Sequence, residues 1–259
     1  GHAERGQSMS MGFDAARHLL LRTGFGGSLA TTGHLARQTR ESAVRELLER
    51  VALTAAPREP DFLSEPLPNR RERRRMGQEF RMLQRQRGRA LKEWWYQEMV
   101  TTTSPLTERL VLFWHNHFTS ALRKVRAPQL MYRQQQIFRA HALGNFREML
   151  HRIATDPAML VYLDGVYSER RQPNENFARE LFELFTLGEG HYTEEDIREA
   201  ARAFTGWTID RESGDFRLAP RNHDFGIKTV FGERGTFDGH DVIELVLRQE
   251  RTAVHIVEK

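Results

Sequence analysis

Apolar residues recur at helical spacing along most of this chain, which predicts a mainly α-helical fold. The first such stretch, residues 13–22, reads FDAARHLLLR and stops at the glycine-rich turn 24–27. Proline, glycine and helix-capping residues separate the later periodic stretches. Helices are expected over residues 13–22, 41–53, 70–100, 104–123, 128–143, 145–156, 175–187, 194–204 and 241–259.

Three stretches depart from this helical pattern. Residues 1–12 have no apolar core and are interpreted as a tag remnant with a mobile lead-in. Residues 54–69 hold four prolines, which predicts an extended, mobile linker. Residues 208–240 are rich in glycine and contain short β-like runs such as KTVF, which predicts a glycine-rich loop region with a small β-hairpin. We therefore expect a single extended multi-helix domain over residues 13–259, with the linker inside it.

Composition excludes several classes of chemistry. The chain has 259 residues and no cysteine, so disulfides, thiolate metal sites and cysteine nucleophiles are excluded. No window approaches the roughly 18 apolar residues that a membrane span requires, so no span is expected. The formal charge is only +4, although arginine supplies all but four of the 39 basic residues.

The most basic segment is residues 70–92, which carries ten basic side chains. A solvated helix face with arginine–glutamate pairs is one interpretation, and an anion-binding surface is the other. No aromatic residues are interleaved as in single-strand platforms, and no helix-turn-helix spacing accompanies the segment. Nucleic acid is therefore an unfavoured partner.

The motif FWHNHF at residues 113–118 raises the question of a metal site. On a helix its two histidines point about 200° apart, so they cannot chelate one ion together. His117 falls on the apolar stripe that contains Leu106, Leu110 and Phe113. A core histidine satisfied by one hydrogen bond is the plain interpretation of His117.

The motif NENFARELFELFTLG carries an acidic stripe. Asn176, Glu180 and Glu183 follow one another at i, i+4 and i+7, with Arg179 beside them. A solvated surface stripe would explain this spacing. However, the helix is apolar around more than half its circumference, so its acids would need buried partners: arginine, histidine or a metal.

A third candidate segment is RNHDFGIKTVFG, where His223 and Asp224 precede a glycine. We hypothesise that His117 meets Glu180 and Glu183 across two packed helices, and that His223 and Asp224 close over them. Such groups suit a divalent transition metal bound by His117, Glu180, Glu183 and His223. Without metal, the same groups would form a histidine–carboxylate network. The candidate catalytic groups are Glu180, Glu183, His223 and Asp224.

Taken in order, the runs RHLLLRTGFGG, FWHNHF, DPAMLVYLD, NENFARELFELFTLGEGHYTEEDIREAARAFTGW and HDFGIKTVFG resemble the bacterial domain-of-unknown-function-1800 (DUF1800) family. The resemblance implies a mostly helical bacterial protein, often exported to the periplasm or beyond. It also implies a partner, another exported protein encoded nearby, but no particular reaction. Family members usually extend past the position of Lys259, so a C-terminal part of the family domain is expected to be missing.

Three functions are left open by the sequence. The first is an envelope-associated enzyme with a buried His/Glu site, with or without a metal. The second is a non-catalytic envelope or assembly protein with a structural Arg–Glu–His network. The third is polyanion or nucleic-acid binding through residues 70–92.

Overall fold

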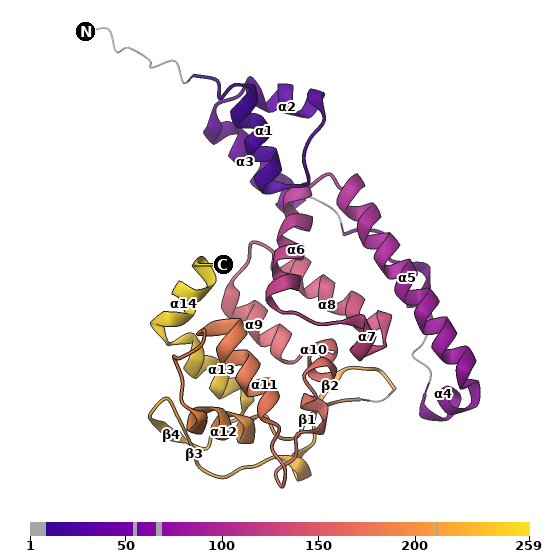
Figure 1. Cartoon of the computed structure of the whole chain (residues 1–259), viewed down its shortest axis with the longest axis vertical. Helices are drawn as coiled ribbons and strands as arrows, with labels where there is room; N and C mark the ends of the chain where they lie inside the picture. Colours follow the sequence, from indigo (N-terminus) through magenta and orange to yellow (C-terminus); the bar gives the residue numbers. More distant parts are fainter. Residues whose placement is uncertain (1–8, 54–55, 66–68, 211) are drawn as a thin grey trace. The chain divides into compact units, whose positions relative to one another are not determined.

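The computed structural model describes residues 9–53, 56–65, 69–210 and 212–259, and its fold is mainly α-helical (Figure 1). This confirms the predicted fold class. Residues 1–8 of the predicted lead-in, and residues 54–55 and 66–68 of the predicted linker, lie outside the described residues. Within the described chain, no helix combines the length and the apolar character needed to cross a membrane.

The chain divides into two compact units, each built from two stretches of sequence. One unit comprises Gly1–Pro60 and Lys92–Phe113, and the other comprises Asp61–Leu91 and Trp114–Lys259. The expectation of one domain over residues 13–259 stays a prediction.

The smaller unit is helical. It contains α1 (Phe13–Thr23), α2 (Leu29–Ala36), α3 (Arg40–Leu53), the end of α5 (Gln78–Thr101) and the start of α6 (Pro105–His117). Its core includes Ala16, Leu20, Leu35 and Ala43. The sequence analysis missed α2, which begins at Ser28, where the hydroxyl oxygen accepts the N–H of Thr31 and caps the helix.

The larger unit holds most of the remaining helices and all the described strands. Its helices are α4 (Arg70–Met76), α7 (Leu122–Val125), α8 (Pro128–Ala140), α9 (Phe146–Ala154), α10 (Pro157–Tyr162), α11 (Glu175–Glu180), α12 (Glu194–Ala203), α13 (Gly239–Leu247) and α14 (Glu250–Val257), with the start of α5 and the end of α6. Short 3₁₀ helices cover Asp61–Ser64, Gly165–Tyr167 and Pro220–Asn222, and a π-helix (η3) covers Leu181–Thr186.

Several predicted helices are shorter in the structure than expected, or are divided in two, as residues 241–259 are into α13 and α14. The helix predicted over residues 70–100 is two helices, because Gly77 adopts a left-handed conformation with φ of +51° and separates α4 from α5. The helix predicted to reach Arg123 ends at His117. Three residues further on, the buried Ser120 hydroxyl donates a hydrogen bond to the Gln134 side-chain oxygen, 2.5 Å away.

Two small antiparallel sheets occupy the glycine-rich region. Strand β1 (Trp207–Ile209) pairs with β2 (Phe216–Leu218), and β3 (Lys228–Val230) pairs with β4 (Glu233–Gly235). The region therefore contains two hairpins where one was predicted.

Helix α12 packs on α11, and its small residues Ala200, Ala201 and Ala203 are buried. The rings of Phe204 and Trp207 then pack on Phe177, with centroid distances of 4.8 Å and 6.3 Å. Helix α12 thus contacts the acidic motif, and it also contacts strand β3 of the glycine-rich region.

Candidate functional site

The acidic motif begins as α11 and continues as the π-helix η3. Asn174 caps α11, and its side-chain oxygen accepts the N–H of Asn176 at 2.9 Å. At the end of the π-helix the N–H of Leu187 donates to the carbonyl of Phe182, five residues earlier, at 2.8 Å. Such wide turns occur frequently at functional sites, which makes this segment a candidate site.

Side chains from other helices bind carbonyl groups at the end of this π-helix. The Nε2 atom of His117 lies 3.0 Å from the carbonyl oxygen of Phe185. The Nε2 atom of His255 lies 3.0 Å from the carbonyl oxygen of Leu184. The Nε of Arg251 donates to the carbonyl of Leu187 at 3.0 Å. These bonds satisfy carbonyls that a helix end leaves without an intrahelical partner.

His117 is buried, with 9% of its surface exposed. Burial lowers its pKa to about 4, and the nearby His255 and Lys259 add a smaller effect in the same direction. The ring is therefore neutral at pH 7, and because a carbonyl only accepts, Nε2 carries the proton. These contacts are those of a core histidine with a backbone hydrogen bond, the plain interpretation of FWHNHF.

The two acids of the stripe have different surroundings. Glu183 is half-buried and accepts the hydroxyl proton of Tyr192 at 2.7 Å. Glu180 is also half-buried, and burial, followed by the charge of Glu183, raises its pKa. Arg179 turns away to Glu194, with both of its terminal nitrogens 2.8 Å from that carboxylate. Leu184, which follows Glu183, is 45% exposed.

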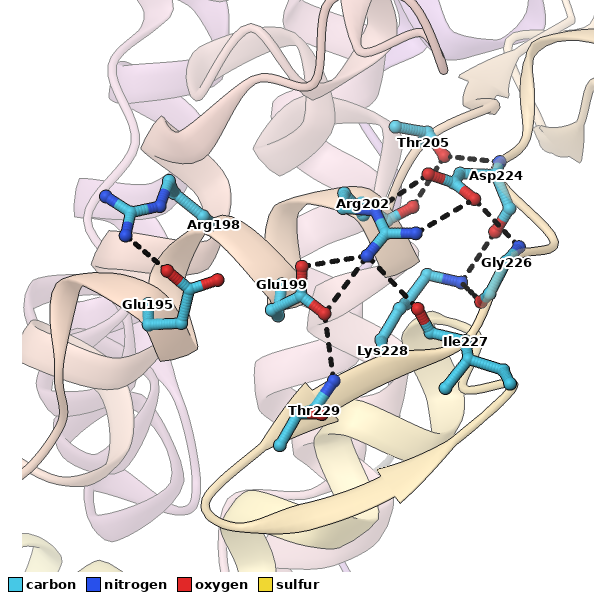
Figure 2. Close-up of polar contacts among 10 residues, drawn as sticks. All are labelled: Glu195, Arg198, Glu199, Arg202, Thr205, Asp224, Gly226, Ile227, Lys228 and Thr229. Atoms are coloured by element: carbon cyan, nitrogen blue, oxygen red, sulfur yellow. Dashed lines mark hydrogen bonds and ion pairs between the residues drawn. The ribbon is translucent and has the colours of Figure 1, made fainter.

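The loop that carries His223 and Asp224 is fastened to the end of α12. His223 is buried, and its Nδ1 lies 2.7 Å from the carbonyl oxygen of Thr205. The Asp224 N–H donates to the Thr205 hydroxyl at 2.8 Å, and the Asp224 carboxylate accepts from the Arg202 Nε at 2.8 Å (Figure 2). The Arg202 guanidinium holds the pKa of Asp224 below its ordinary value.

Arg202 is the centre of this network, which Figure 2 shows between α12 and strand β3. Its Nη1 binds both carboxylate oxygens of Glu199, at 2.8 Å and 3.0 Å, and the carbonyl of Ile227 at 3.1 Å. Glu199 in turn accepts the backbone N–H of Thr229 at 2.9 Å. The Arg202 guanidinium thus joins the carboxylates of Glu199 and Asp224 to the carbonyl of Ile227. Each of the two carboxylates also accepts a backbone N–H of the loop region.

Lys228 completes the network from inside the loop. Its side chain is 1% exposed, and its Nζ donates to the carbonyls of Asp224, at 2.6 Å, and Gly226, at 3.0 Å. Burial lowers the pKa of this ammonium group. A buried cation bound by backbone carbonyls fixes the shape of the turn.

The structure does not bring the predicted metal ligands together. Among the described residues, no group of three or more histidines, aspartates or glutamates is placed to hold a metal ion. His117 binds the Phe185 carbonyl, Glu183 binds Tyr192, and His223 binds the Thr205 carbonyl. Glu180 and Glu183 lie close enough for their charges to interact, whereas His117 and His223 are each bound to a backbone carbonyl, and the ligand set of His117, Glu180, Glu183 and His223 stays a prediction.

Sequence reasoning missed several residues that shape this region. Tyr192 and Arg202 lie within 22 residues of their acidic partners, but side-chain hydrogen bonds leave no periodic signal. His255 is 71 residues from the carbonyl that it binds. A second histidine cluster, His151 with His240, joins helices 89 residues apart in sequence. Only the fold reveals such pairs.

Comparison with known proteins agrees with the motifs described above. No curated protein and no solved structure matches the chain. A family model described as "Protein of unknown function (DUF1800)" matches residues 18–259, nearly the whole chain. The chain therefore belongs to the DUF1800 family.

Proposed function

We propose that the chain is a non-catalytic assembly protein of the bacterial envelope, in which a network of arginine, carboxylate and histidine side chains keeps a helical body rigid. The observation that carries the proposal is what these side chains bind. His117, His223 and Glu199 each hydrogen-bond to the main chain of another segment, and Lys228 hydrogen-bonds to the main chain of its own turn. Groups used in this way fix one packing arrangement of the chain, a role documented for some buried polar networks.

The smaller unit supplies a surface suited to a protein partner. Leu21, Phe25 and Leu29 are 52%, 43% and 81% exposed around the glycine-rich turn. Beside the same turn lies a pocket of about 430 Å³, lined by Leu20, Thr23, Gly24, Gly26, Gly27, Thr31, Leu35, Leu47, Arg50, Thr102, Thr103 and Pro105. Exposed apolar side chains next to a concave surface are typical of protein contacts. By resemblance, the partner is the exported protein encoded nearby.

A second function, catalysis, is favoured by one observation. Burial first, and then the negative charge of Glu183, raises the pKa of Glu180. A half-buried carboxyl of this kind could serve as a general acid, with Glu183 and Tyr192 beside it.

The test is co-expression of the chain with the exported protein encoded beside it. Complex formation is measured by size-exclusion chromatography with light scattering. We expect a complex with the native chain, loss of the complex in the surface variant Phe25→Ser, and retention in the double variant Glu180→Gln/Glu183→Gln.

Absence of a complex with the native chain would contradict the proposal. The same proteins are also assayed for hydrolysis of ester, peptide and glycoside substrates. Turnover that is present in the native chain and lost in the folded Glu180→Gln/Glu183→Gln variant would favour the enzyme.

A further inference from the structure

A cluster of four polar side chains lies where α9 and α13 pack together. Helix α9 contributes Arg147 and His151, which are four residues apart, and α13 contributes His240 and Glu244 at the same spacing. Residues at i and i+4 share one helix face, so each helix presents both of its side chains to the other. None of these four residues belongs to the acidic motif or to the Arg202 network.

Glu244 fixes the orientation of His151. Its Oε1 lies 2.6 Å from the Nε2 of His151, and its other carboxylate oxygen binds the guanidinium of Arg147. A carboxylate accepts hydrogen bonds, so Nε2 of His151 carries the proton and Nδ1 presents a lone pair. Metal-binding histidines are commonly held by a carboxylate in this way.

The free edge of His151 faces a second imidazole. Nδ1 of His151 lies 3.3 Å from Nδ1 of His240, with ring centroids 5.5 Å apart. Two histidine nitrogens bound to one tetrahedral zinc ion, at Zn–N distances of about 2.0–2.1 Å, are separated by about 3.3 Å. The spacing of the two nitrogens is thus already that of a pair of metal ligands.

We propose that His151 and His240 bind a divalent transition metal, Zn²⁺ first among them, through their Nδ1 atoms, with water completing the coordination. Imidazole nitrogen is a favoured ligand for Zn²⁺. His240 is exposed, so an ion and its water ligands can reach the pair from solvent. Binding requires only that His240 carry its proton on Nε2.

This site is independent of the acidic motif and of the assembly proposal. It offers two protein ligands. Among the described residues, no group of three or more possible ligands is placed to hold a metal ion, so water must supply the remaining ligands here. The competing explanation of the same geometry is a hydrogen bond between the two rings, with one proton shared between the Nδ1 atoms. The two explanations differ in one measurable property, the affinity for Zn²⁺.

The experiment is isothermal titration of the full chain, after chelator treatment, with Zn²⁺ at pH 7.5. The native chain is expected to bind one ion at this site. His240→Ala, which alters an exposed side chain, is expected to abolish that binding, with folding checked by circular dichroism. Glu244→Gln is expected to weaken it about 10–100-fold, because it removes the carboxylate that orients His151.

The matched control is His141→Ala, which removes another histidine of the same unit and should leave Zn²⁺ binding unchanged. A second readout is the tryptophan fluorescence of the chain, because Trp207, one of its four tryptophans, has its ring centroid 5.1 Å from that of His240. Co²⁺ should quench it in the native chain and not in His240→Ala. The proposal is overturned if the native chain binds no Zn²⁺, or if His240→Ala binds it equally well.

Discussion

His117 donates its Nε2–H to the carbonyl oxygen of Phe185 across 3.0 Å, and this bond ties the end of α6 to the π-helix. The ring of His255 lies beside it, 6.2 Å between centroids, and bonds to the preceding carbonyl, that of Leu184. Two histidines, from an early and a late helix, therefore close the same end of the acidic motif.

Replacing His117 with alanine should destabilise the protein by about 2–3 kcal/mol, because it leaves the buried Phe185 carbonyl without its donor and opens a cavity. The measurement is urea unfolding followed by circular dichroism. The control is His191→Ala, which alters an exposed histidine and should change the free energy of unfolding by no more than about 0.5 kcal/mol. Equal effects of the two substitutions would contradict a structural role for His117.

The same histidine should make stability depend on pH. Its folded-state pKa of about 4 lies below the ordinary 6.5, so the unfolded chain binds the proton more readily. Its contribution is therefore fully present above pH 6.5 and is lost as pH falls toward 4, by up to about 1.4 kcal/mol per pH unit. In His117→Gln the free energy of unfolding should fall less between pH 7.5 and pH 4.5 than in the native chain, as measured by unfolding curves at pH 4.5, 5.5 and 7.5. If the free energy of unfolding fell equally with pH in the two proteins, His117 would not be the source of this pH dependence.

Asp156 should act in the opposite direction. This carboxyl is fully buried and caps α10, accepting the Met159 N–H at 2.8 Å, and burial raises its pKa to about 7. Its stabilising contribution is therefore present below the ordinary value of 3.8 and is lost as pH rises through 7. Asn is an equally good cap. The free energy of unfolding of Asp156→Asn should therefore rise relative to that of the native chain as pH rises, by up to about 1.4 kcal/mol per pH unit. A stability difference that does not change between pH 5 and pH 8 would refute this.

Local signals predicted the helical fold and several of its boundaries. The helix predicted over residues 194–204 closely matches α12 (Glu194–Ala203), whose start is marked by the short-range capping box of Thr193 and Asp196. The break at Gly77 was missed because a single glycine inside a charged run is compatible with a continuous helix. The π-helix was missed because its apolar pattern is also that of an α-helix.

The candidate site was predicted less well than the fold. The sequence identified His117, Glu180, Glu183, His223 and Asp224 as the polar residues of distinctive segments. Their partners could not be deduced, because His117 and His223 bind backbone carbonyls, which carry no residue identity. The Arg202 contact to Asp224 spans 22 residues and depends on the loop folding back onto α12. Helical spacing alone cannot decide between such a contact and a shared metal ion.

Arg202 and Arg198 lie one turn apart on α12 and provide a matched pair of substitutions (Figure 2). Arg198 binds only the exposed Glu195 among the residues drawn, whereas Arg202 joins Glu199 and Asp224, whose side chains are 15% and 16% exposed. Arg202→Met leaves these two carboxylates without their cation and should cost about 2 kcal/mol or more. Arg198→Met should leave the unfolding midpoint unchanged, since exposed ion pairs contribute little.

The loop itself gives a second readout of the Arg202 substitution. Phe225 is 64% exposed and follows Asp224, so chymotrypsin can reach its side chain but needs the backbone to open before it can cut. We expect faster cleavage after Phe225 in Arg202→Met than in the native chain, and unchanged cleavage in Arg198→Met. Because the assembly proposal relies on a rigid body, equal cleavage in all three proteins would remove its main physical support.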